Sequence, residues 1–152
     1  MKRIAVFPGS FDPFTLGHED IVKRALPLFD HVIIAIGVNA SKKYHFPLEL
    51  RMEWIGKVFA TEEKVSVKKY EGLTVDFCRG NGANFILRGL RSNVDFEFEK
   101  PIAHMNTAMA NEIETVFLVT SPELSGINST IVRDIIKNGG NASQFLPKEI
   151  EI

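Results

Sequence analysis

The chain has 152 residues, of which 45% are hydrophobic and 24% are charged, a balance typical of a globular protein with a full core. The formal net charge of −1 provides no global attraction for nucleic acid or for an anionic membrane, so neither partner is expected. The first apolar run, Ile4–Phe7, is too short for a signal peptide, and no stretch approaches the roughly 20 apolar residues of a membrane helix. We therefore expect a cytoplasmic protein with a single domain over residues 1–152.

Strand-like and helix-like segments alternate along the chain. Two of the β-branched segments, Val32–Val38 and Val116–Val119, are continuously apolar, as in strands buried on both faces of a parallel sheet. The segments between the strands have helical spacing, and the last of them stops at Asn138-Gly139-Gly140. The predicted strands are Ile4–Phe7, Val32–Val38, Val65–Val67, Phe85–Leu87 and Val116–Val119, and the predicted helices are Glu19–Phe29, Leu48–Ala60 and Thr130–Lys137.

This alternation predicts an α/β fold in which helices flank a five-stranded parallel sheet with right-handed crossovers. In such sheets ligands bind beyond the carboxyl ends of the strands, at the point where the strand order reverses. Polar and basic residues that directly follow a predicted strand are therefore the candidates for a functional site.

The loop after the first strand has the features of a phosphate site. Gly9 permits close backbone approach, Ser10 provides a hydroxyl, and Pro13 stiffens the loop. His18 falls in the first turn of the next helix, where free amides and the helix dipole favour an anion. An imidazole there can donate a hydrogen bond to a phosphoryl oxygen. A plain glycine-proline turn whose histidine packs or caps the helix also fits these residues.

Basic and hydroxyl residues follow three later strands. Lys42-Lys43 comes after the second strand, although paired loop lysines are commonly no more than solvated surface. Arg88-Gly89-Leu90-Arg91 follows the fourth strand, where two rigid guanidinium groups suit either a phosphate clamp or a surface ion pair. Ser125–Thr130 follows the fifth strand, and its helix-capping hydroxyls and amides also suit a phosphate.

Together these loops resemble the bacterial phosphopantetheine adenylyltransferases of the nucleotidyltransferase superfamily. Thr15-Leu16-Gly17-His18 is similar to the T/HxGH signature, and Ser125–Arg133 to the ISSTxxR element. Arg88-Gly89-Leu90-Arg91 with Asp95-Phe96-Glu97-Phe98-Glu99 resembles the family's RGLR…DFEYE segment. The resemblance implies a Rossmann-like dinucleotide-binding fold and an enzyme of coenzyme A biosynthesis. It would transfer AMP from ATP to 4'-phosphopantetheine, giving dephospho-coenzyme A and pyrophosphate.

The resemblance also implies roles for individual residues. The catalytic residues would be His18, Lys42 and Arg91, with His18 stabilising the pentacovalent α-phosphate. The acceptor would be bound by Ser10, Lys42, Thr74 and Arg88. The ATP site would be lined by Ser10, Phe11, His18, Gly89, Leu90, Arg91, Glu99, Leu124, Ser125, Gly126, Ile127, Asn128, Ser129 and Thr130. The implied reaction is a direct in-line attack without a covalent intermediate, which relies on alignment and charge stabilisation.

Cofactor and partners follow from the same resemblance. It implies Mg²⁺, a homohexamer and feedback inhibition by coenzyme A. Mg²⁺ often binds through substrate phosphates and water, Asp12 is only a weak candidate ligand, and no metal-binding residue is predicted. Cys78 is the only cysteine, so an intrachain disulfide is excluded, and its apolar neighbours predict a buried, unreactive thiol.

Three residues depart from the family pattern. Phe98 stands where the family often has tyrosine, and Asn128 replaces a serine. Pro101 falls in the middle of an expected helix, where it deletes a backbone hydrogen bond and costs roughly 3 kcal/mol unless a kink is accommodated. Two alternative functions stay open at this point. One is an adenylyltransferase for another phosphorylated acceptor such as nicotinamide mononucleotide, and the other is a nucleotide-sensing module without turnover.

Overall fold

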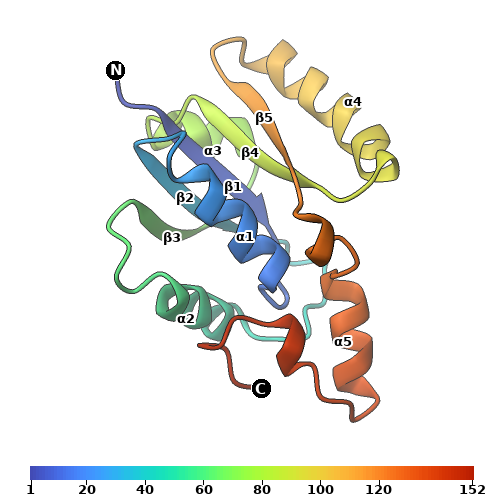
Figure 1. Cartoon of the computed structure of the whole chain (residues 1–152). Coiled ribbons are helices and arrows are strands. Elements are labelled where there is room, and N and C mark those ends of the chain that lie inside the picture. The colour runs from blue at the N-terminus through green and yellow to red at the C-terminus, as the bar shows by residue number, and fades with distance from the viewer.

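The computed structural model describes all residues from Met1 to Ile152 and confirms the predicted α/β fold (Figure 1). Five parallel strands form one sheet in the order β3-β2-β1-β4-β5. The strands are β1 (Ile4–Gly9), β2 (His31–Gly37), β3 (Val65–Tyr70), β4 (Phe85–Leu90) and β5 (Glu114–Val119). The helices are α1 (Leu16–Ala25), α2 (Leu48–Val58), α3 (Thr74–Gly80), α4 (Asn93–Met109) and α5 (Ser129–Lys137), with short 3-10 turns at Pro122–Leu124 and Ser143–Phe145.

Helices cover both faces of the sheet. Successive residues of a strand point to opposite faces, so neighbouring apolar residues pack against different helices. Phe7 and Ile34 belong to a large apolar cluster with residues of α1, α2 and α5. Val6 and Ile33 belong to a smaller cluster with residues of α3. Figure 1 shows α1 in front of the sheet and α3 behind it. Cys78 of α3 lies in the smaller cluster and is buried as predicted, and this burial raises the pKa of its thiol to about 11.

Two predictions about the elements are wrong. α1 ends at Ala25 rather than Phe29, because Pro27 has no amide to continue the helical hydrogen bonds. The strand predicted at Val116–Val119 is not buried on both faces: β5 pairs only with β4, so it is an edge strand, and Val119 is exposed. α3 is a further helix that was not predicted, and it begins at Thr74, one of the residues expected to bind the acceptor.

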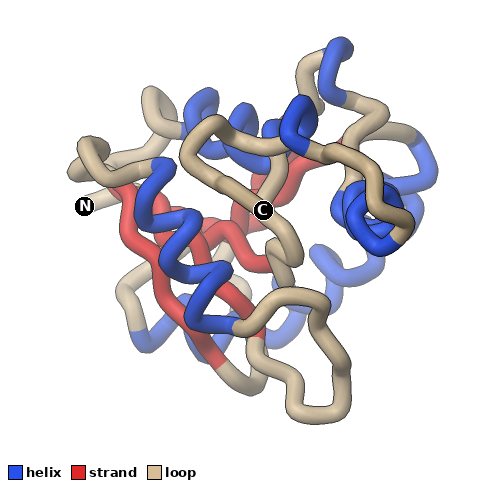
Figure 2. Tube along the Cα trace, turned by 90° about the horizontal axis from the view of Figure 1, so that it is seen from below, coloured by secondary structure: helices blue, strands red, loops and turns tan.

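The chain after α5 contains no further α-helix. This C-terminal segment is mostly loop, drawn in tan in Figure 2, and it runs back toward α2 (Figure 1). Leu146 and Ile150 are buried there in the large cluster, together with Trp54 and Ile55 of α2. The segment thereby closes the α2 side of the core. None of the helices is both long enough and apolar enough to cross a membrane.

Candidate active site

Two adjoining cavities open where β1 and β4 end. The chain leaves β1 for β2 on one side and returns to the other side at β4, so the strand order reverses between β1 and β4. The larger cavity has a volume of about 720 Å³ and the smaller one about 310 Å³. Their common wall consists of Pro8, Gly9, Ser10, Arg88 and Glu99. A ligand in one cavity therefore lies directly beside a ligand in the other, at the position expected for this fold.

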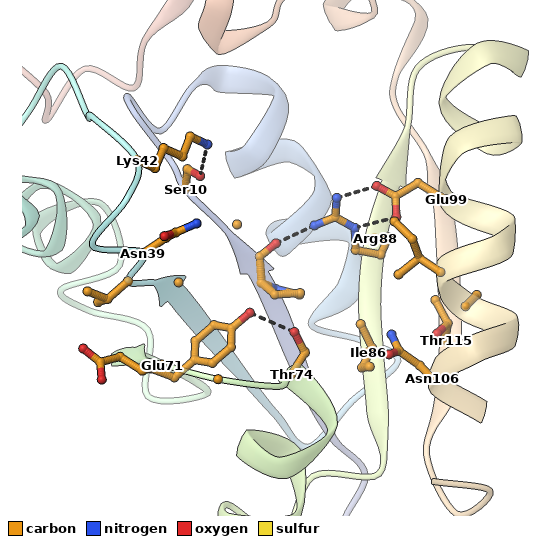
Figure 3. Close-up of a pocket in the computed structure, with 18 of the residues that line it drawn as sticks. Ser10, Asn39, Lys42, Glu71, Thr74, Ile86, Arg88, Glu99, Asn106 and Thr115 are labelled. Carbon is orange, nitrogen blue, oxygen red and sulfur yellow. Dashed lines mark hydrogen bonds and ion pairs between the residues drawn. The ribbon is translucent and has the colours of Figure 1, made fainter. Parts of the chain in front are cut away.

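The larger cavity contains all four residues that were predicted to bind the acceptor, namely Ser10, Lys42, Thr74 and Arg88 (Figure 3). At one end, the Lys42 ammonium group donates a hydrogen bond of 3.1 Å to the Ser10 hydroxyl. At another wall, the hydroxyls of Tyr70 and Thr74 lie 2.9 Å apart. Lys43, which was interpreted as surface, is exposed and does not line the cavity.

Arg88 stands on the wall between the cavities with its guanidinium plane fixed. Its Nε lies 3.1 Å from Glu99 Oε2, its Nη2 bonds Glu99 Oε1, and its Nη1 donates to the Pro8 carbonyl at 2.6 Å (Figure 3). A guanidinium group has five N–H donors, and these contacts use only three of them. The remaining donors and the rigid fork suit a phosphate.

His18 is oriented by the start of α1. Thr15 is the N-cap, and its backbone amide donates to His18 Nδ1 at 3.0 Å. Because a backbone amide can only donate, Nδ1 must be an acceptor, and the ring proton of the neutral imidazole is on Nε2. His18 therefore caps the helix, as the alternative interpretation held, and it lines the smaller cavity with its Nε2–H not used in the cap.

The electrostatic surroundings keep His18 neutral. Burial, together with the positive charges of Arg88 and Arg91, lowers the pKa of its imidazole to about 3. Rings of Phe11 and Phe14 lie against the imidazole, with centroids 5.0 and 5.3 Å away. At neutral pH this histidine is therefore a hydrogen-bond donor without a charge, and positive charge at the site comes from the arginines.

Gly9 and Gly89 let the backbone approach its neighbours closely. A Cβ atom on Gly9 would lie 2.9 Å from the Phe11 ring, and one on Gly89 would lie 3.0 Å from the Ile21 side chain. Phe11 itself has a φ of 47° and is buried, so its ring packs under the loop and against His18. A side chain at either glycine would push these walls apart.

Most of the residues predicted for the ATP site line the smaller cavity. Those that do are Ser10, Phe11, His18, Gly89, Arg91, Glu99, Ile127, Asn128, Ser129 and Thr130. Those that line neither cavity are Leu90, Leu124, Ser125 and Gly126. Arg91 is held beside the cavity by Asp95, whose carboxylate accepts from the Arg91 amide at 2.8 Å and from its Nε at 3.1 Å.

The side chains at the start of α5 are occupied by the fold itself. Asn128 Oδ1 accepts from the amide of Ile131 at 2.8 Å, and the Ser129 hydroxyl donates to the Pro13 carbonyl at 2.8 Å. The asparagine that replaces the family's serine is thus the N-cap of α5. Helix N-termini carry free amides that suit an anion, and the first residues of α5, Ser129 and Thr130, line the smaller cavity.

Sequence reasoning missed a set of buried and half-buried groups that hold the loops. The carboxylate of Asp12 is 4% exposed and accepts from the amides of His45 and Phe46 at 2.8 and 2.9 Å. Arg133 donates to the Asp12 carbonyl at 2.7 Å, and Arg51 donates to the Ser10 carbonyl at 2.7 Å. Both carboxylate oxygens of Asp12 are occupied, and no group of three His, Cys, Asp or Glu residues could hold a metal ion.

The sequence matches known nucleotidyltransferases. Residues 6–135 match the family model described as cytidylyltransferase-like. A protein of Flavobacterium psychrophilum named phosphopantetheine adenylyltransferase is 58% identical over 150 residues, which cover 99% of each chain. A protein of the same name from Cytophaga hutchinsonii is 51% identical over 150 residues, which cover 99% of this chain and 100% of that one.

Solved structures share the fold at low sequence identity. The bifunctional NMN adenylyltransferase/ADP ribose pyrophosphatase of Francisella tularensis superposes with a TM-score of 0.73 at 21% identity. The match covers 96% of this chain and 45% of that one, so the chain spans less than half of the bifunctional protein. A candidate nicotinate-nucleotide adenylyltransferase of Vibrio parahaemolyticus superposes with a TM-score of 0.71 at 18% identity, over 98% of this chain and 96% of that one.

Proposed function

The chain belongs to the phosphopantetheine adenylyltransferases, and we propose that it transfers AMP from ATP to 4'-phosphopantetheine. The products are dephospho-coenzyme A and pyrophosphate, in the biosynthesis of coenzyme A. One structural observation supports this proposal independently of the family membership. The cavity with Ser10, Lys42 and Arg88 shares a wall with the cavity of His18 and Arg91, so an acceptor phosphate and an ATP α-phosphate can meet.

The larger cavity suits an acceptor with a phosphate at one end and a less polar arm. Lys42, Arg88 and the Ser10 hydroxyl provide positive charge and donors for the phosphate. Away from them the lining includes Ile86, Phe98 and Ile102, together with the amide of Asn106 (Figure 3). Ala103 and Asn106 of α4 line this cavity, whereas His104 and Met105 between them are exposed.

The reaction we propose needs no general base. An ionised oxygen of the acceptor phosphate attacks the α-phosphorus of ATP, and the bond to the bridging oxygen breaks as pyrophosphate leaves with the electron pair. The Nε2–H of His18 donates to an α-phosphate oxygen as negative charge builds on it, and Arg91 stabilises the same charge. Lys42 and Arg88 hold the attacking phosphate in line, which reduces the entropy cost of the step.

We also propose that ATP enters as its Mg²⁺ complex. Mg²⁺ would be held by phosphate oxygens and water, since both oxygens of Asp12 accept backbone amides and no three-residue acidic cluster exists. The ion would reduce the charge of the leaving pyrophosphate. A structure of the Francisella tularensis protein with AMP and a manganese ion has a TM-score of 0.70 and 21% identity to this chain, and covers 96% of this chain and 44% of that one.

We further propose that coenzyme A inhibits the enzyme by feedback, that the chain forms a homohexamer, and that the protein is cytoplasmic. Coenzyme A has the same pantetheine arm as the acceptor, so it would compete for the larger cavity. Exposed apolar side chains along α4 support the assembly of several copies, because contact between copies would remove this apolar surface from water. They include Val94, Phe98, Ile102, Met105 and Met109.

The deciding experiment is pyrophosphate release with MgATP and a panel of phosphorylated acceptors. We expect release with 4'-phosphopantetheine alone, with dephospho-coenzyme A identified by mass spectrometry. Pyrophosphate release only with nicotinamide mononucleotide would support adenylyl transfer as the reaction but would show that the proposed acceptor is wrong. Tight ATP binding without release from any acceptor would instead support a nucleotide-sensing module.

A further inference from the structure

We propose that Arg51 is a positioning residue of the acceptor-phosphate site, which fixes the loop of Ser10 against the loop of Lys42. The inference rests on the proposed function, since the acceptor phosphate is taken to lie between these two side chains. Arg51 lines neither of the two adjoining cavities. It would therefore act on the substrate only through its neighbours.

The burial of Arg51 sets it apart from the other basic residues. Its side chain projects from the first half of α2 and is 2% exposed, and it is the only lysine or arginine among the buried residues. It lies on the same helical face as Ile55 and Val58, which face the core. Removing a cation from water is costly unless its donors are satisfied, so its contacts must compensate.

The guanidinium of Arg51 bonds the backbones of two different loops. Its Nε donates to the Phe46 carbonyl at 2.9 Å, in the loop between β2 and α2. Its Nη1 donates to the Ser10 carbonyl at 2.7 Å, in the loop between β1 and α1. Because the guanidinium is planar and rigid, the two bonds together fix the separation of the two carbonyls.

Tyr44 extends this connection toward Lys42. The guanidinium carbon of Arg51 lies 4.3 Å from the centroid of the Tyr44 ring, and the Lys42 ammonium lies 5.3 Å from the same centroid. The Tyr44 hydroxyl donates to the Gly37 carbonyl at 3.3 Å, at the end of β2. One aromatic ring, held by the strand end, is thus attracted to both cations.

Asp12 braces the same loop from the other side. Its carboxylate accepts from the amides of His45 and Phe46, while Arg51 bonds the Phe46 carbonyl. Phe46 is therefore held through both of its backbone groups. Ser10 and Lys42 lie in the two loops joined in this way, and their side chains meet at 3.1 Å on the cavity wall (Figure 3). Without the guanidinium group of Arg51, the distance between the Ser10 loop and the Lys42 loop would no longer be fixed.

The first test compares Arg51→Met with the wild-type enzyme. Methionine keeps most of the apolar stem but removes the fork. We expect kcat/KM for 4'-phosphopantetheine to fall about 10- to 100-fold, because a misplacement of about 1 Å has an effect of that order. The affinity for MgATP, measured by calorimetry without acceptor, should stay within about twofold. Arg51→Lys keeps the charge without the fork and should recover only part of the loss.

Arg79→Met is the matched control. Arg79 is a surface residue that pairs with Glu112 and lines neither cavity, so its replacement should leave both substrates unaffected. If Arg51→Met does not fold, the folded Arg51→Lys protein is tested against the same expectations. Equal losses of ATP and acceptor affinity in the folded variant would indicate a general structural role and overturn the positioning role.

A double-mutant cycle with Lys42→Met shows whether Arg51 acts through Lys42. In the Lys42→Met background we expect Arg51→Met to cost no more than about twofold in kcat/KM for the acceptor. A full additional loss in that background would overturn the inference. An active wild-type enzyme with a normal Arg51→Met variant would overturn only the positioning role. A wild-type protein without adenylyl transfer would overturn the proposed function and this inference with it.

Discussion

At the scale of single residues, His18 combines two tasks in one ring. One nitrogen accepts from the Thr15 amide and thereby fixes the tautomer, and the other nitrogen keeps its proton for a ligand. Burial, assisted by the nearby Arg88 and Arg91, keeps the ring neutral rather than charged. The donor is therefore in place before a substrate arrives, which is how preorganised groups stabilise developing charge.

Replacement of His18 by alanine should separate binding from turnover. We expect kcat to fall about 10²- to 10³-fold, because the variant lacks the donor to the α-phosphate in the transition state. The affinity for MgATP should change little, since Arg91 and the α5 amides remain. Turnover is followed by pyrophosphate release, with His31→Ala as the control, a change at the amino end of β2 and thus away from the carboxyl ends of the strands. Near-normal turnover would remove His18 from the mechanism.

The pKa of His18 also predicts how stability depends on pH. The folded protein keeps this histidine neutral down to about pH 3, whereas in the unfolded chain it binds a proton near the ordinary histidine pKa of 6.5. Between these values the unfolded state binds more protons, so this residue makes the protein less stable as the pH falls. Unfolding by urea should therefore show a weaker loss of stability below about pH 6.5 in His18→Gln than in wild type. Identical pH dependence of the two proteins would contradict the low pKa.

Residues of the site differ in how well the sequence predicts them. Ser10, His18 and Arg88 lie in recognisable strings at or shortly after the ends of strands, and the structure brings them together. Asp12 and Arg51 bond backbone groups of loops that are distant in sequence, so no local pattern indicates their partners. The one signal for Arg51 is an arginine at core-facing helical spacing.

At the scale of elements, strands were easier to predict than the ends and surroundings of helices. Continuous apolar residues identify β2, which is buried along its length. The same pattern in β5 did not reveal that this strand lies at the edge of the sheet, because sheet position depends on strand order rather than on local sequence. α3 is only seven residues long, so helical spacing gave little signal.

Pro101 offers a test of the energetics of α4. The helix runs from Asn93 to Met109 through this proline, which has no amide to donate to the carbonyl of Glu97. We expect Pro101→Ala to raise the unfolding free energy by about 1–3 kcal/mol, because it restores that hydrogen bond and a better helix former. Thermal unfolding measures the change, and Lys100→Ala at the neighbouring exposed position should change stability by less than about 0.5 kcal/mol. A lower melting temperature for Pro101→Ala would show that the proline stabilises the fold.

At the scale of the whole molecule, the two large faces of the sheet are covered unequally. α1, α2, α5 and the C-terminal segment enclose one face, whereas α4 exposes apolar side chains beside the edge strand β5. The α/β fold could be predicted from the alternation of elements. The exposed apolar side chains of α4 could not be predicted, because exposure depends on how α4 packs.

The proposed homohexamer predicts the mass of the particle in solution. Light scattering after size exclusion should give about six times the chain mass of 17.1 kDa. Met105→Asp places a charge on the exposed face of α4 and should shift the mass toward smaller species, because burying an unpaired carboxylate is costly. Glu62→Asp, on the loop after α2, is the control. A monomer for the wild-type protein would rule out the hexamer.

The shared wall of the two cavities has a consequence for ligand design. Pro8, Gly9 and Ser10 separate the sites by the thickness of one loop, and Arg88 faces both of them. A bisubstrate inhibitor that links an adenylyl group to a pantetheine-like arm would place its second half at a high effective concentration once the first half is bound. The affinity of the linked inhibitor should then far exceed the affinity of either half alone. A short, rigid linker should give the highest affinity.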